Sequence, residues 1–136
     1  MPQLRCYDPG EAGGGIHQWY ADVAAATQAA IDAALENIID EGDLEALPQF
    51  KALRGACKGL DEIIVDVSAG PKYRILCFRG PGRGDLTLLP GFEKSARGSV
   101  DFGPHCWSAN KRKEGVTRDG RRAPRCRFPQ DIASCG

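Results

Sequence analysis

The spacing of apolar residues changes part-way along the chain, and this change limits it to folds that mix helices and strands. Between residues 16 and 39 apolar side chains recur at steps of three and four residues, the spacing of one face of an α-helix. The segments 62–67, 73–78 and 85–89 are instead short, apolar and separated by glycine-containing turns, which is typical of a strand meander. We therefore predict an α/β domain of the α+β type, with an N-terminal strand over 2–7 and helices packed on one face of a small antiparallel sheet.

One long helix and one shorter helical piece are expected in the first half of the chain. The helical spacing predicts a helix of about 24 residues over 16–39 that ends at Glu41 and Gly42. A shorter piece follows over 44–53, and we expect Pro48 to start a turn inside it or to break it.

The last part of the chain carries a different composition. Residues 100–136 have little periodicity and contain many arginines, lysines, glycines and prolines. We therefore predict two units, a folded domain over 1–99 and an irregular, basic, loop-rich extension over 100–136.

Charge is divided unequally between the two halves, although the net charge of the chain is zero. Residues 1–68 carry 4 basic and 12 acidic side chains, a net charge of −8, and residues 69–136 carry 14 basic and 6 acidic ones, a net charge of +8. Such a division indicates a polyanion-binding face on the basic half. The alternative, that the basic segment folds onto the acidic helix, is compatible with it.

The cysteines allow two interpretations. The chain contains six of them, Cys6, Cys57, Cys77, Cys106, Cys126 and Cys135. An even number is compatible with disulfides, but the N-terminal residues do not follow the pattern of a secretory signal. We therefore expect a cytoplasmic protein in which Cys57 and Cys77 are small core residues.

We expect no bound metal ion, no cofactor and no membrane-spanning segment. His105 and the cysteines 106, 126 and 135 are the only candidate metal ligands, but their spacing lacks the C-x-x-C pair of common zinc sites. The chain also lacks an apolar run of the about 20 residues that a membrane-spanning helix needs.

The meander carries four short motifs in a fixed order. Leu53-Arg54-Gly55 is followed by Gly59-Leu60-Asp61-Glu62-Ile63, then by Tyr73-Arg74-Ile75, and last by Leu88-Leu89-Pro90-Gly91-Phe92-Glu93-Lys94. In this order they resemble the RelE/ParE toxin superfamily, closest to its phage-derived, HigB-like branch. The resemblance extends over residues 3–98.

This resemblance implies a toxin of a type II toxin–antitoxin system. Such a protein is a metal-independent endoribonuclease, an mRNA interferase that cleaves mRNA, often on the ribosome, and is silenced by an antitoxin protein. The chemistry uses the 2′-hydroxyl as an internal nucleophile, so it needs a proton acceptor, a proton donor and cations that stabilise the crowded phosphate.

Four side chains are the candidates for these catalytic roles. Arg74 matches the arginine of the family's Y-R strand, Lys94 matches the basic residue at the end of the third meander strand, and Arg97 follows it. His105 is a candidate acid or base because histidine changes its charge near neutral pH. For Arg74 the alternative is an exposed strand arginine that pairs with an acidic neighbour.

Further cations are candidate RNA contacts, since binding a phosphate backbone needs positive charge. These residues are Lys72, Arg79, Lys111, Arg112 and Lys113.

Two departures from the family pattern leave another function open. The strand over 62–67 has acids and aliphatic residues where other members have two lysines, and glycine and proline after residue 97 predict that the family's C-terminal helix is missing. The alternative is a non-catalytic RNA-, ribosome- or protein-binding module of phage or mobile-element origin on the same fold. A gyrase poison of the ParE type would share the fold as well.

Overall fold

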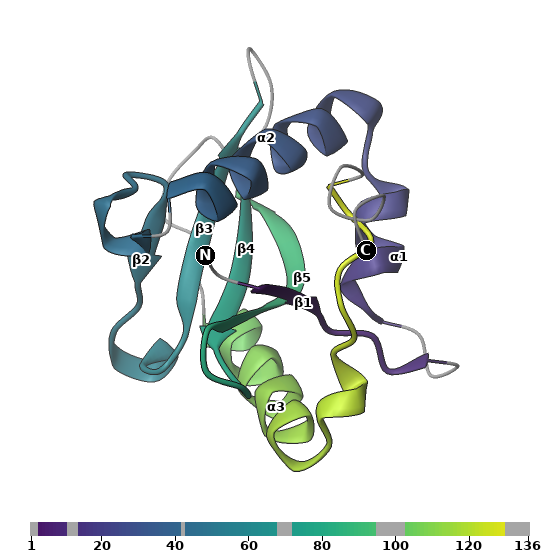
Figure 1. The fold of residues 1–136 in the computed structure, drawn as a ribbon, viewed down its shortest axis with the longest axis vertical. Coiled ribbons are helices and arrows are strands. Elements are labelled where there is room, and N and C mark those ends of the chain that lie inside the picture. The colour runs from purple at the N-terminus through teal and green to yellow at the C-terminus, as the bar shows by residue number, and fades with distance from the viewer. Residues whose placement is uncertain (1–2, 11–13, 42, 68–71, 95–102, 130–136) are drawn as a thin grey trace.

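The protein was analysed as a computed structural model that describes residues 3–10, 14–41, 43–67, 72–94 and 103–129. These residues form a five-stranded sheet with helices on both faces (Figure 1). The elements are β1 (Gln3–Cys6), α1 (Ile16–Asp22), α2 (Ala25–Glu41), β2 (Phe50–Ala52), β3 (Asp61–Asp66), β4 (Lys72–Arg79), β5 (Asp85–Lys94) and α3 (Gly103–Arg118). Within these ranges, no helix combines the length and the apolar character that crossing a membrane requires.

The strand order is β1-β5-β4-β3-β2, which confirms the α+β class. Strands β2 to β5 pair antiparallel, as the meander predicts, but β1 runs parallel to β5 with Leu4 opposite Leu86. The prediction of a purely antiparallel sheet is therefore wrong. A parallel neighbour requires a long connection, and the helices and the meander between β1 and β5 supply it.

The long helix predicted over 16–39 is two helices, α1 and α2, separated by an extended Val23. A straight helix of that length would measure about 36 Å, whereas the outer strands of a five-stranded sheet lie only about 19 Å apart. The break lets α1 pack against β5 and α2 against β3. Gln28 stabilises it by donating a hydrogen bond from Nε2 to the carbonyl of Tyr20, at 2.9 Å, which α1 leaves without a helical partner.

The segment over 44–53 is also shorter in helix than predicted. A single 3₁₀ turn, η2 (Leu44–Ala46), is followed by the edge strand β2.

Strand β5 continues through Pro90 beyond its predicted end, and an irregular register opposite Ile75 and Cys77 accommodates the proline. Next to it Gly91 allows close packing, because a Cβ there would lie 2.6 Å from Trp19 Cζ2.

Two apolar cores lie on the two faces of the sheet. The first, between the sheet and α1 and α2, contains Ile31, Leu35 and Ile63, each fully buried. The second, between the sheet and α3, contains Leu76 and Phe78 of β4. Because side chains alternate along a strand, the odd and even positions of β4 face different cores.

The prediction of an irregular extension over 100–136 is wrong for 103–118, which form the 16-residue helix α3. Cys106, Ala109 and Val116 of this helix are buried in the second core. Their spacing of three and seven residues keeps them on one helical face, so α3 is an integral layer of the fold and lies below the sheet in Figure 1.

The chain after α3 covers the free edge of β1. The amide of Cys6 donates to the carbonyl of Pro124, and the amide of Cys126 donates to the carbonyl of Leu4. The tail then continues beside α1, where Phe128 stacks on Tyr20 with ring centroids 4.1 Å apart. An otherwise unpaired edge strand is thereby protected.

Candidate functional site

Arg74 lies in the middle of the sheet, on the face that α3 covers. Its register partners are Ile64 on β3 and Phe92 on β5. Only 6% of the residue is exposed. Its Nη1 donates to the carbonyl of Tyr73 at 3.1 Å, so the guanidinium is held close to the backbone of its own strand.

Glu62 is the charged partner of Arg74. Its Oε2 lies 3.5 Å from Arg74 Nε, and both side chains are less than one-tenth exposed. That oxygen makes no hydrogen bond within the described residues. Since an unpaired charge is costly to bury, the pair explains how an arginine can lie inside the sheet layer, and Glu62 is a site residue that the sequence analysis did not single out.

His105, in the first turn of α3, lies over the same part of the sheet. Its ring stacks on Phe92 with centroids 3.8 Å apart and planes within 6° of parallel. Phe92 stands opposite Arg74 in the register of β4 and β5. The fold therefore places His105 against Phe92 of the fourth motif, whereas the guanidinium of Arg74, the neighbour of Phe92 in the register, is directed toward Glu62 on β3.

The other two predicted catalytic residues lie at or beyond the end of β5. Lys94 ends the strand, with its Cα opposite Lys72 at the start of β4. Lys72 is exposed and lies two residues before Arg74, at the same end of the sheet. Arg97 lies outside the described residues.

Arg79 lies at the opposite end of β4 from Lys72. Its guanidinium is 3.3 Å from Glu45 Oε1 and 3.9 Å from Asp61 Oδ2. A strand rises about 3.3 Å per residue, so Arg79 lies about 17 Å from Arg74 along β4 and belongs to a separate surface.

The three consecutive cations on α3 point in different directions. Lys111 is exposed, with Nζ 5.6 Å from the centroid of Trp107. Arg112 lies over the ring of Tyr7, and Lys113 donates from Nζ to the carbonyl of Gly59 at 2.9 Å. Successive side chains of a helix point about 100° apart, so the three cations predicted to contact RNA together are distributed around α3. Lys111 is the exposed one of the three.

The comparisons with known proteins add no relative. No protein-family model matches the chain, and no curated protein sequence matches it.

Four of the six cysteines form disulfides, although the sequence favours no disulfide framework, and Cys57, predicted as a small core residue, is both buried and bonded. Cys6 is bonded to Cys126 and Cys57 to Cys106, with Cα atoms 4.9 Å and 5.3 Å apart. Cys77 is buried and free, as predicted. The even cysteine count was the available signal, but spacing alone does not reveal which cysteines the fold brings together.

Two of the four candidate metal ligands are used in disulfides. Cys106 and Cys126 belong to different disulfides, and Cys135 lies outside the described residues. Among the residues that the structure describes, no group of three or more histidines, cysteines and carboxylates could hold a metal ion.

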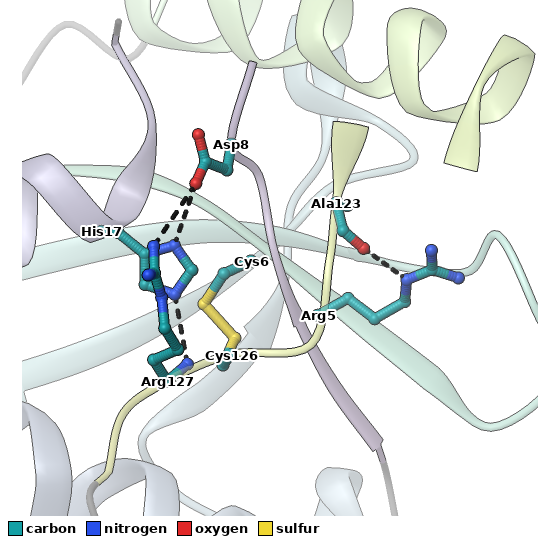
Figure 2. The surroundings of a disulfide bond; sticks show 7 residues. All are labelled: Arg5, Cys6, Asp8, His17, Ala123, Cys126 and Arg127. Atoms are coloured by element: carbon teal, nitrogen blue, oxygen red, sulfur yellow. Dashed lines mark hydrogen bonds and ion pairs between the residues drawn. A yellow bond between two sulfur atoms is a disulfide. The ribbon is translucent and has the colours of Figure 1, made fainter. Parts of the chain in front are cut away.

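The second histidine lies beside the Cys6–Cys126 disulfide (Figure 2). His17 Nε2 accepts a hydrogen bond from the backbone amide of Arg127 at 3.1 Å, and its Nδ1 lies 3.5 Å from Asp8 Oδ2. An accepting Nε2 assigns the ring proton to Nδ1, on the side of the carboxylate. The ring thus holds the C-terminal tail, and its basic nitrogen is occupied by the backbone rather than open to a substrate.

Acid should weaken this attachment. Burial lowers the pKa of His17 below its ordinary value of 6.5, and the charge of Arg127 lowers it further, against the opposing effect of Asp8. Between 6.5 and the lower folded value the unfolded chain binds more protons, so the free energy of unfolding should fall as the pH falls through this window. Urea unfolding at about pH 7.5 and about pH 5.5 measures the change.

His17→Gln is the matched control for this prediction. The variant has no titrating ring at position 17, so the difference in stability between it and the wild type should shrink as the pH falls. A difference that is the same at both pH values would exclude His17 as the source.

Proposed function

We propose that the protein is a RelE-like toxin of a type II toxin–antitoxin system that binds mRNA on the α3 side of its sheet and cleaves it by attack of a 2′-hydroxyl. The observation that carries this proposal is the stacking of His105 on Phe92, a residue of the fourth motif that stands opposite Arg74 in the strand register. Helix α3 adds support, because the resemblance calls for a C-terminal helix after β5. The proposal includes an antitoxin protein and the ribosome as partners.

The roles proposed for these residues follow from their exposure. His105 is half-buried at the edge of the stack on Phe92, where its imidazole can exchange a proton with the 2′-hydroxyl or the leaving 5′-oxygen. Lys72 is exposed at the start of β4 and supplies positive charge for the phosphate. Lys94, whose Cα lies opposite that of Lys72, is assigned the same role from the resemblance alone. Arg74 is buried against Glu62, so its role is to hold β3 and β4 together beneath α3 rather than to contact the phosphate.

Cleavage of a defined message by the purified protein, with and without ribosomes, tests the proposal. His105→Gln should lower the cleavage rate by about 10²- to 10⁴-fold, the usual contribution of a general acid or base. His17→Gln is the control, since the chain has two histidines and His17 lies at the tail. Cleavage by the wild type that His105→Gln leaves unchanged would contradict the assigned role.

The burial of Arg74 favours a second candidate function, a non-catalytic RNA-binding module. An arginine that is 6% exposed and already paired with a carboxylate is poorly placed to stabilise a phosphate. Under this alternative the wild type binds RNA, no cleavage is detected with or without ribosomes, and His105→Gln leaves the affinity unchanged.

A cytoplasmic location belongs to the toxin proposal, because mRNA and ribosomes are there. Disulfides are uncommon in that compartment. The proposal therefore requires that the fold survive reduction of the Cys6–Cys126 and Cys57–Cys106 bonds.

A further inference from the structure

The outer face of α3 combines an exposed aromatic ring with positive charge. Trp107 is 66% exposed and is the one large hydrophobic side chain so exposed in the part of the chain that the structure describes. It borders a shallow hollow lined by Gly103, Trp107, Asn110, Lys111 and Glu114, and a second hollow, which includes Arg118, adjoins it along the helix.

The packing of α3 explains why this face is free of contacts with the sheet. Cys106, Ala109 and Val116 fill the second core, and the exposed residues Trp107, Lys111, Glu114 and Arg118 lie on the opposite side of the helix. Trp107 and Lys111 lie one turn apart on this outward face, and the ammonium of Lys111 lies 5.6 Å from the indole centroid. The pairing of ring and cation is thus presented to solvent rather than used inside the fold.

We propose that this outer face is an RNA subsite, in which an unpaired base stacks on Trp107 while Lys111 and Arg118 contact the neighbouring phosphates. This inference rests on the proposed function and extends it to a second surface of the same helix. Exposed aromatic rings bordered by cations are the features by which proteins bind single-stranded nucleic acid.

Charge favours RNA over a protein as the occupant. Among the exposed charged side chains of α3, Lys111 and Arg118 are positive and Glu114 is negative. In the 3₁₀ turn after the helix, Gly120–Arg122, Arg122 is exposed, whereas exposed Arg121 is paired with Asp119 at 3.0 Å and adds no net charge. A mostly cationic surface of this kind attracts a polyanion.

The subsite lies next to the proposed cleavage site. Trp107 follows His105 by two residues, so both are in the first turns of α3, one facing solvent and the other facing Phe92. The two side chains point about 200° apart around the helix, so a single strand that occupies both sites must curve around the start of α3.

Fluorescence of Trp107 provides the test. The chain has two tryptophans, and Trp19→Phe leaves Trp107 as the only one. The two probes are a single-stranded oligouridylate and heparin, a polyanion without bases. The oligouridylate should quench the emission of Trp107 and heparin should not. In the otherwise unchanged protein, Trp107→Ala should weaken oligouridylate binding by roughly 5- to 150-fold, and Trp107→Phe should retain most of the affinity.

Each other result overturns the subsite, and the results separate it from the proposed function. Oligouridylate binding that Trp107→Ala leaves unchanged, or equal quenching by heparin, excludes base stacking on Trp107 and leaves mRNA cleavage at His105 standing. Loss of a protein partner by Trp107→Ala, with RNA affinity unchanged, assigns the face to that protein. If the wild type neither binds nor cleaves RNA, both proposals fail.

Discussion

Replacing Cys6 and Cys126 together with alanine should lower the free energy of unfolding by about 5 kcal/mol. The bond joins residues 120 positions apart, so it restricts most of the chain in the unfolded state, and the chain-entropy cost of closing a loop rises with its length. The bond also fastens the C-terminal tail to the edge of β1. There the amide of Cys6 donates to the carbonyl of Pro124, and the amide of Cys126 donates to the carbonyl of Leu4. Urea unfolding of the oxidised wild type and the double variant measures the difference.

Cys77→Ala is the control for this comparison. Cys77 is buried and free, so its replacement removes a buried sulfur without opening a loop and should cost only about 1 kcal/mol. The Cys57→Ala/Cys106→Ala variant opens a shorter loop, with a sequence separation of 49, and should lose about 4 kcal/mol. Equal stabilities of wild type and the Cys6→Ala/Cys126→Ala variant would show that the bond is absent from the folded protein.

Glu62→Ala should destabilise the protein by about 3 to 5 kcal/mol, because it leaves the Arg74 guanidinium buried without its carboxylate partner. Glu62 and Arg74 are 7% and 6% exposed, and the pair distance is 3.5 Å. A charge removed from water to this extent depends on its partner far more than a surface charge does. Denaturant unfolding gives the magnitude.

Glu62→Leu combined with Arg74→Met tests the same pair in the opposite sense. The double variant buries no charge, so it should recover most of the stability that either single replacement loses. It also separates structure from activity, since a stable double variant that still cleaves mRNA would assign Arg74 a purely structural role. A loss of less than about 1 kcal/mol in Glu62→Ala would place the pair at a solvated surface instead.

The sequence predicts the elements of the fold better than their limits. The helical spacing over 16–39 identifies the buried face correctly, since Ile31 and Leu35 are fully buried. It does not reveal the break at Val23, because the break accompanies the packing of α1 on β5 and of α2 on β3, which is tertiary structure. The parallel placement of β1 beside β5 likewise depends on tertiary packing, which a local pattern does not contain.

Helix α3 was missed because its start contains Gly103 and Pro104, which read as a broken segment. Proline is tolerated in the first turn of a helix, where its missing amide has no helical partner. Cys106, Ala109 and Val116 share one helical face, so a periodicity signal was present but short of large apolar residues. Gly115 lies inside the helix, and its missing side chain leaves room for Arg122, because a Cβ at position 115 would lie 3.2 Å from Arg122 Nη1.

The candidate site was predictable in part. The resemblance singles out Arg74, and the chemistry of histidine singles out His105, but neither indicates that His105 stacks on Phe92, the register neighbour of Arg74. That arrangement depends on the register of β4 and β5 and on the position of α3. The burial of Arg74 against Glu62 depends on the same helix, which the sequence analysis did not expect.

Replacing a single ribose in the RNA tests the proposed attack by the 2′-hydroxyl. Once the wild-type protein's cleavage site on a message is mapped, with ribosomes if they are needed, the nucleotide on its 5′ side is changed to a 2′-deoxynucleotide. Because the 2′-hydroxyl is the proposed nucleophile, cleavage at that site should be abolished, while an unmodified site in the same message is still cut. Unchanged cleavage at the deoxy site, or no cleavage of the unmodified message under either condition, would contradict it.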